Sequence, residues 1–289
     1  MNGPQGLSAL LPQIVCRRHQ LPAQLERSFR LETTVGLLPH RYILGTPARL
    51  IAPSCLEQVV DELGMPVTND WVRAVLYPQL QKASTMYLGY EHGPDGESHR
   101  LYFEFWDAVV HRLRSTPSTE IALWSSGQGV RPLWEMGIGH KWQTGTSLYS
   151  TLYRVQPLLP QEAIREKACD LLTSLAMPTD LAGLVLSLID QILRQAPTID
   201  PIFLEVVEPD SPRLSFDLCV HRLGLTFADL QAWLNPIVHW FLGEDSCLND
   251  CVHSDGWNGY VTHVSAGCSR RGQPYCCVYY DLGPGASGY

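Results

Sequence analysis

Five times along the chain, a short polar turn joins two strand-like segments, and a helix-like stretch separates most of the copies. The five hairpins are expected at residues 29–45, 86–106, 134–155, 202–221 and 260–282. In the clearest strand, 213–221, the odd positions are polar and the even positions are apolar. Since successive side chains of a strand point to opposite faces, this strand has one apolar face and one polar face. We therefore predict an α+β fold, in which helices cover the apolar faces and five αββα repeats close a ten-strand antiparallel β-barrel around a polar lumen.

The hairpins extend from one end of the 289 residues to the other, which favours a single domain spanning 1–289. We expect 1–28 to be a leading segment with a short helix at 21–27, and 283–289 to be a loose tail. Ser54 is the expected N-cap of a helix at 55–63. No element is assigned to the turn-rich residues 114–132. Further helices are expected at 69–82, 108–113, 160–175, 181–194 and 226–242.

Composition excludes several classes of protein. The formal net charge of −8 argues against a nucleic-acid-binding surface, which would be basic. The sequence has no apolar run of 18 residues and no signal peptide at its start, so we expect neither a membrane span nor secretion. Nine cysteines, an odd number, favour reduced thiols and a cytoplasmic protein. Cys247, Cys251 and His253 lie close together, but their spacing is not typical of zinc sites, and a structural role is expected.

Strand parity predicts which side chains point into the barrel. Any one of them alone would be interpreted as a solvated polar residue, because alternation is also typical of half-exposed strands. A basic residue or paired tyrosines recur in each of the five hairpins, however, and this repetition favours a shared interior. The predicted inward residues are Arg30, Glu32, Thr34, Arg41, Arg100, Tyr102, Glu104, Trp106, Lys141, Tyr149, Thr151, Tyr153, Arg213, Ser215, Asp217, Cys219, His221, Tyr275, Cys277 and Tyr279.

Several cations in one partly dry, concave place repel each other unless a polyanion joins them. Arginine and lysine donate charge-assisted hydrogen bonds to phosphate oxygens, so a diphosphate is the expected ligand. The aromatic wall suits an apolar tail and could stabilise a carbocation through its π faces. Glu32, expected beside Arg41, is then a candidate acid/base group.

Short segments in order along residues 30–282 resemble the strand motifs of the ABBA prenyltransferases, whose barrel has the architecture predicted above. The resemblance is greatest to the compact cyanobactin (ribosomal peptide) prenyltransferases and more distant to the fungal indole prenyltransferases. The matching segments are Leu31-Glu32-Thr33-Thr34, Arg41, Arg100-Leu101-Tyr102, Gly137-Ile138-Gly139-His140-Lys141, Arg213-Leu214-Ser215-Phe216-Asp217 and Pro274-Tyr275-Cys276-Cys277-Val278-Tyr279-Tyr280.

The resemblance implies that Glu32 is catalytic. It also implies that the diphosphate is held by Arg41, Arg100, Tyr102, Lys141, Tyr149, Arg213, Tyr275 and Tyr279. The chain departs from the family where Ser215 and Asp217 replace a basic residue and a tyrosine, and where Tyr149 replaces a second lysine. A less basic site leaves room for Mg²⁺, and no other cofactor is expected. The sequence has no DDxxD motif, which disfavours a classical terpene synthase.

The expected activity is transfer of a dimethylallyl or geranyl group from its diphosphate, through an allylic cation, to a peptide side chain. The acceptor could be Trp or Tyr in a linear or macrocyclic peptide, an aromatic small molecule, or the guanidine of Arg. The proposed acceptor-binding residues are Glu104, Trp106, Asp217 and His221. The carboxylates of Glu104 and Asp217 could bind a guanidinium, although the protein's own arginines could satisfy them instead. The alternative is a non-catalytic barrel that binds a hydrophobic small molecule or peptide.

Overall fold

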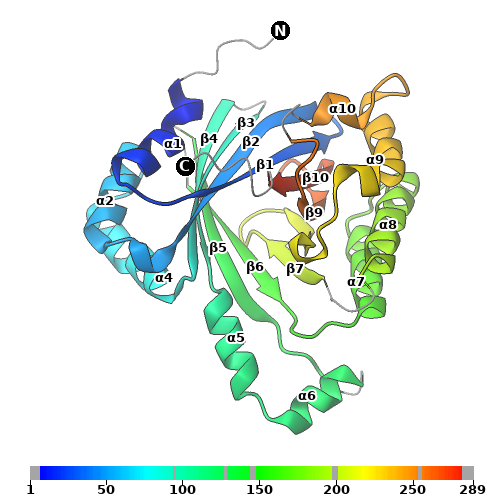
Figure 1. Ribbon diagram of the computed structural model, residues 1–289, viewed down its shortest axis with the longest axis horizontal. Helices are drawn as coiled ribbons and strands as arrows, with labels where there is room; N and C mark the ends of the chain where they lie inside the picture. The colour runs from blue at the N-terminus through cyan, green and yellow to red at the C-terminus, as the bar shows by residue number, and fades with distance from the viewer. Residues whose placement is uncertain are drawn as a thin grey trace.

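The computed structural model describes residues 7–93, 96–126, 129–143, 148–196, 201–252 and 256–281. Ten antiparallel strands form a closed barrel in which each strand pairs with its sequence neighbours (Figure 1). The last strand pairs with the first, for example Val278 with Phe29, so that the barrel has no open edge. The predicted ten-strand fold is confirmed. The strands are β1 Gln24–Glu32, β2 Gly36–Pro47, β3 Thr85–Gly93, β4 Gly96–Glu104, β5 Trp134–Trp142, β6 Tyr149–Val155, β7 Ile202–Val207, β8 Leu214–Cys219, β9 Val261–Cys268 and β10 Pro274–Asp281.

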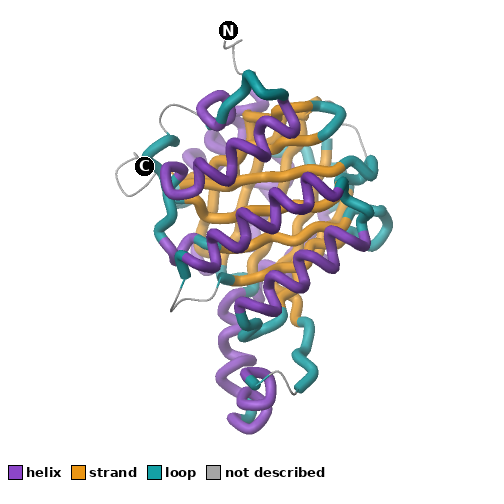
Figure 2. Tube along the Cα trace, turned by 90° about the vertical axis from the view of Figure 1, so that its right-hand side faces the viewer, coloured by secondary structure: helices purple, strands orange, loops and turns teal. Residues whose placement is uncertain are grey.

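Helices surround the barrel. Figure 1 shows α7, α8 and α9 on one side and α1, α2 and α4 on the other, while Figure 2 shows long helices crossing in front of the strands. The pair α5 and α6 extends away from the barrel as an arm (Figures 1 and 2). The described helices are α1 Leu7–Arg18, α2 Pro53–Glu62, α3 Asn69–Trp71, a π-helical turn Val72–Leu76, α4 Tyr77–Lys82, α5 Trp106–Ser115, α6 Ser118–Ser125, α7 Gln161–Ser174, α8 Thr179–Arg194, α9 Phe227–Leu242 and α10 Leu248–Cys251, with short 3₁₀ helices at Ala48–Leu50 and His221–Leu223. None of the helices described in these ranges is long and apolar enough to span a membrane.

The apolar alternate residues of the strands form the core outside the barrel wall. Phe216 and Leu218 of β8 are fully buried in a cluster that includes Leu188 of α8 and Leu234 of α9. A second cluster on the other side joins residues of β2 to β4 with α2 and α4. Burying one Leu or Phe side chain contributes about 1.5–3 kcal/mol. The helices thus stabilise the barrel from outside, and the lumen is left to the polar alternate positions.

The structure corrects the expected N-terminal segment. Residues 21–27 do not form a helix, because β1 begins at Gln24 and pairs with strands on both sides. Glu26, for example, lies opposite Ile43 of β2 and Asp281 of β10. Ladder hydrogen bonds to two strands outweigh the weak local preference for a helix. The leading segment instead contains α1, and Glu26 becomes a barrel residue.

Other expected boundaries also differ. The first helix after the opening hairpin has Ala52 rather than Ser54 at its N-cap, because Pro53 occupies the first helical position. Residues 114–132 include α6. Strand β4 ends at Glu104, so Trp106 begins α5, and His221 lies in a 3₁₀ helix. The turns at 94–95 and 144–147, His253 and the tail 283–289 lie outside the described residues.

Candidate active site

The two ends of the barrel lumen have different chemistry. At the end where hairpin turns join the strands, which we call the cation end, arginine and lysine side chains gather around carboxylates. At the other end, where strands meet helices, a cavity opens. The inward face of β4 spans the distance between them, since Arg100, Tyr102 and Glu104 follow one another at alternate positions. We describe the site in that order.

Glu91, near the end of β3, organises the cation end and was not predicted as a site residue. It is 6% exposed. Arg41 Nε donates to its Oε2 at 3.1 Å, Lys141 Nζ donates to its Oε1 at 2.9 Å, and Arg100 also donates to Oε2. Burial alone would raise the pKa of Glu91, but these three cations and Arg30 hold it well below its ordinary value. The ionised carboxylate therefore joins three of the predicted diphosphate ligands.

A second carboxylate, Glu208 in the turn between β7 and β8, organises the opposite wall. Arg213 Nη1 and Thr151 Oγ1 donate to its Oε1 at 2.6 and 2.9 Å, and Arg270 donates to its other oxygen. Burial disfavours the charged form, yet Arg270 and Arg213 lower the pKa of Glu208 to about 2. The guanidinium carbon of Arg270 also lies 3.4 Å from the ring centre of Tyr149. Tyr149, which is 43% exposed, therefore lies at the rim of the site.

Glu32 lies at this end of the barrel, but the expectation that it adjoins Arg41 is wrong. Arg41 pairs across the strands with Ser28, four residues before Glu32 on β1. The neighbours of Glu32 are Arg30, whose Nη2 lies 2.5 Å from its Oε2, and Ser269, whose hydroxyl donates to Oε1 at 3.3 Å. Strand register separates the two predicted residues, and a register of this kind cannot be obtained from parity alone.

The cation end has unsatisfied hydrogen-bond donors. Among the described residues, five buried guanidinium nitrogens have no hydrogen-bond partner, and the four of them at the cation end belong to Arg30, Arg100, Arg213 and Arg270. The site contains six cations against three carboxylates, a net formal charge of +3 when all nine groups are ionised: Arg30, Arg41, Arg100, Lys141, Arg213 and Arg270, with Glu32, Glu91 and Glu208. A buried unsatisfied donor costs about 1–3 kcal/mol. A polyanion with several acceptor oxygens would satisfy both the charge and the donors.

Tyrosines fill the lumen next to the cation end. The Tyr102 ring packs edge-on against Tyr153, with centroids 4.8 Å apart, and lies 5.4 Å from Tyr87. Gly137 makes this possible, because a Cβ at that position would collide with the Tyr102 hydroxyl. Burial raises the pKa of Tyr102 and of Tyr153, so both hydroxyls stay neutral donors. Neutral aromatic rings of this kind suit an apolar chain or a cation beside their faces.

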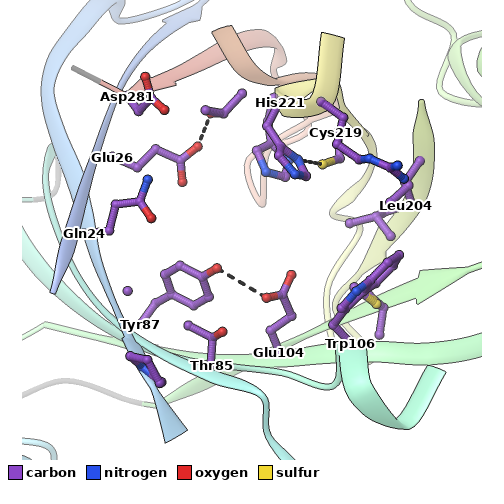
Figure 3. Close-up of a pocket in the computed structure, with 17 residues that line it drawn as sticks. Gln24, Glu26, Thr85, Tyr87, Glu104, Trp106, Leu204, Cys219, His221 and Asp281 are labelled. Carbon is purple, nitrogen blue, oxygen red and sulfur yellow. Dashed lines mark hydrogen bonds between the residues drawn. The ribbon is translucent and has the colours of Figure 1, made fainter. Parts of the chain in front are cut away.

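The helix end of the lumen holds a cavity of about 530 Å³. Figure 3 shows Glu26, Tyr87 and Glu104 pointing into the same space. Thr262 donates a hydrogen bond to Glu26, and the Tyr87 hydroxyl donates to Glu104 at 3.3 Å. Burial raises the pKa of both carboxyl groups, although His263 acts in the opposite direction. Two carboxyl groups of raised pKa facing one cavity are candidates for proton transfer to or from a bound molecule.

Three of the four predicted acceptor residues line the cavity, and the fourth does not. Glu104, Trp106 and His221 line the cavity. Asp217 is not among the lining residues, and its Oδ1 lies 2.6 Å from Nδ1 of His263. The expectation that arginines pair with Glu104 and Asp217 is wrong, since Tyr87 and His263 take that place.

Glu26 is the cavity residue that strand parity could have revealed. It shares the inward face of β1 with Arg30 and Glu32, once β1 is known to begin at Gln24. Its register partners step across the sheet from Ile43 to Gly89 and then to Arg100 of the cation end. Glu104 lies four residues beyond Arg100 on the same strand. Along β1, however, Glu26 also lies four residues from Arg30, so strand register does not place one cavity carboxylate nearer to the cation end than the other.

The described residues do not form a metal site. Within the described ranges, no group of three or more His, Cys, Asp or Glu side chains is placed to hold a metal ion. The carboxylates of the cation end, Glu32, Glu91 and Glu208, each contact at least one guanidinium or ammonium group. A role for Mg²⁺ stays a prediction.

No protein-family model and no curated protein sequence matches the chain. Solved structures do match it over nearly its whole length. The 5-dimethylallyl tryptophan synthase from Streptomyces coelicolor, solved with DMASPP and Trp, has a TM-score of 0.58 and 13% identity, covering 90% of this chain and 79% of that one. NotF, solved with brevianamide F and DMSPP, gives 0.52 and 13%, with 90% and 80% covered. The prenyltransferase PriB in its apo form gives 0.53 and 9%, again with 90% and 80% covered.

Identities this low establish a shared fold. The chain has the barrel of the ABBA prenyltransferases, which confirms that part of the resemblance. The narrower resemblance to cyanobactin prenyltransferases stays a prediction.

Proposed function

We propose that the protein is a prenyltransferase that moves a dimethylallyl group from its diphosphate to an acceptor held in the cavity. The observation that carries this proposal is the cation end, where six cations gather inside the barrel and buried guanidinium nitrogens have no hydrogen-bond partner, at the opposite end from the cavity. Among the proteins of this fold, the Streptomyces coelicolor enzyme is solved with DMASPP and Trp. Fold alone does not determine function, so the chemistry of the site has to support each step.

The cation end supports departure of the diphosphate. When the allylic C–O bond breaks, negative charge grows on the leaving diphosphate, and cations stabilise that charge most in the transition state. Arg41, Arg100 and Lys141 would contact it from one wall, and Arg213 from the other. The hydroxyls of Tyr102, Tyr275 and Tyr279 add hydrogen-bond donors, and Tyr149 lies at the rim. Arg30 and Arg270 join this set because of their unpartnered donors.

The tyrosine-lined part of the lumen supports the allylic cation. The electron-rich faces of Tyr87, Tyr102 and Tyr153 stabilise positive charge. A packed aromatic wall also excludes water, which would otherwise capture the cation as an alcohol. A dimethylallyl or geranyl chain would lie here, between the diphosphate and the acceptor.

Glu26 is our first choice for the group that takes the acceptor's proton. When an indole carbon attacks the cation, a C–C bond forms and the ring proton must leave. The Glu26 carboxyl faces the cavity, accepts a hydrogen bond from Thr262, and has a pKa raised by burial. Glu32, implied by the family resemblance, is enclosed by Arg30 and Ser269, and its catalytic role stays a prediction to be compared with that of Glu26.

An indole is the favoured acceptor. The structural neighbours were solved with Trp or with brevianamide F, and Trp106 supplies an aromatic surface to the cavity. A Trp or Tyr side chain in a peptide, as the cyanobactin resemblance implies, extends this proposal. The Arg guanidine is the second choice, because Glu26 and Glu104 could bind a guanidinium together.

The test is incubation of the full chain with dimethylallyl diphosphate and a set of acceptors, read by mass spectrometry and by diphosphate release. The set contains free Trp, linear and cyclic peptides with Trp or Tyr, and peptides that contain Arg but neither Trp nor Tyr. We expect one added dimethylallyl group on an indole. Binding of the donor without product or diphosphate release would favour the non-catalytic barrel.

Substitutions of Glu26 and Glu32 test which carboxylate accepts the proton of the acceptor. Glu26→Gln should lower transfer by about 10²–10⁴-fold while donor binding is retained, as for a positioned acid/base group. Glu205→Gln is the matched control, because Glu205 pairs with Lys167 of α7, away from the lumen. A large loss in Glu32→Gln combined with near-normal turnover in Glu26→Gln would return the role to Glu32.

A further inference from the structure

The wall of the cavity contains a thiol in a chain of hydrogen bonds that the proposed reaction does not use. Cys219 is the last residue of β8, and its Sγ lies 3.1 Å from Nδ1 of His221. Across the sheet its register partner is His263, which also hydrogen-bonds the Cys219 side chain and whose Nδ1 lies 2.6 Å from Asp217 Oδ1. Nucleophile, imidazole and orienting carboxylate are the three parts of an activated cysteine.

Cys219 differs from the other accessible thiols. Four described cysteines are partly exposed, and Cys55 is a suitable comparison because it lies on the outer helix α2. Burial alone would raise the pKa of the Cys219 thiol, but His263 and His221 lower it to about 7. Burial and Glu62 raise the pKa of Cys55. The thiolate is the reactive form of cysteine, so Cys219 is the better nucleophile of the two.

The position of Cys219 matters as much as its ionisation. It lines the same cavity as Tyr87 and Glu104, where the acceptor is proposed to bind. Figure 3 shows Cys219 and His221 across the cavity from Glu26. When no acceptor occupies this space, a sulfur nucleophile is therefore exposed to the place where the allylic cation is consumed.

We propose that Cys219 is an internal acceptor and that the donor alkylates it when the cavity is empty. The allylic C–O bond breaks and its electron pair leaves with the diphosphate. The Cys219 proton is held by the neighbouring imidazole of His221 or His263, and a lone pair of the thiolate sulfur forms the new C–S bond. The product is an S-dimethylallyl cysteine, which occupies part of the cavity and blocks the acceptor. The alkylation rests on the proposed prenyl transfer.

The first measurement does not depend on that activity. Native full-length protein is treated with limiting iodoacetamide, and the labelled cysteines are quantified by peptide mass spectrometry. Cys219 should react about tenfold faster than Cys55, because more of it is thiolate near neutral pH. His263→Gln should slow labelling of Cys219 and leave Cys55 unchanged. Equal rates for Cys219 and Cys55 in the wild-type protein would overturn the proposal.

The second measurement uses dimethylallyl diphosphate without acceptor, and follows diphosphate release and intact mass together. We expect one added dimethylallyl group on Cys219. It should be absent in Cys219→Ser, present in Cys55→Ser, and suppressed by an acceptor that is itself prenylated. Diphosphate release without an adduct contradicts the alkylation and leaves the proposed function standing. If no diphosphate is released with or without acceptors, the proposed function fails, and the alkylation fails with it.

Discussion

Glu91→Gln tests whether the cation end is held together by an internal carboxylate that an external diphosphate assists. Glu91 is 6% exposed and contacts Arg41, Arg100 and Lys141. Glutamine keeps the size of the side chain but removes its charge. The net formal charge of the cation end then rises from +3 to +4, with three cations left facing a neutral amide.

The expected cost in the absence of diphosphate is about 3–5 kcal/mol, the range for removing one partner of a buried ion pair. The control is Glu205→Gln, which breaks the partly exposed pair with Lys167, whose atoms are 3.0 Å apart. Pairs near the surface contribute about 0–1 kcal/mol. The two substitutions make the same chemical change, so the difference between them measures burial and the number of cations contacted.

The assay is urea unfolding with and without inorganic diphosphate. A bound anion stabilises the folded state by about 2.7 kcal/mol at a hundredfold excess over its Kd. Since the variant is more positive at this site, diphosphate should bind it more tightly and restore more of its stability than it adds to the wild type. A loss as small as that of Glu205→Gln, or equal stabilisation of both proteins by diphosphate, would refute the reasoning.

Three further predictions follow from the same geometry. The folded-state pKa of Glu208 is about 2, below its ordinary value near 4.5, so the stability that it contributes is complete above about pH 4.5 and is lost as the pH falls toward 2. The free energy of unfolding, measured across that range, should therefore fall less in Glu208→Gln than in the wild type. Parallel curves for the two proteins would contradict this. Lys141 faces Glu91, Arg100 and Arg30, and burial lowers its pKa to about 7, so its positive charge is lost as the pH rises through 7. Calorimetry should show that the affinity for diphosphate falls more steeply between about pH 6 and pH 8 in the wild type than in Lys141→Arg, because arginine stays charged. Gly137→Ala should destabilise the protein by about 1–3 kcal/mol and displace Tyr102. Gly183 in α8 has open space where a Cβ would be added, so Gly183→Ala should stabilise the protein by up to about 1 kcal/mol. Thermal unfolding of both variants tests this, and equal effects would contradict the close approach of Tyr102 to Gly137.

The alternation of polar and apolar residues predicted the barrel because strand periodicity is a local property. Arg213 to His221 shows it without interruption, and a chain that repeats such hairpins with helices between them must bury one strand face and enclose the other. The same parity correctly placed Arg100, Tyr102 and Glu104 on one inward face. It failed at Glu26, because the few residues before it have no decisive local preference, and only pairing with two neighbouring strands makes them extended.

The tertiary structure decided which side chains contact one another inside the lumen. Glu91 and Glu208 lie near turns, and nothing in their local sequence says that they contact five cations between them. Glu32 was expected beside Arg41, yet strand register gives it Arg30 instead. The sequence alone determined the fold class and the kinds of side chain in the interior, because both depend on period and composition. The pairing of those side chains, and the division into a cation end and a cavity, depend on register and closure among strands far apart in sequence, and these exist only when the barrel is complete.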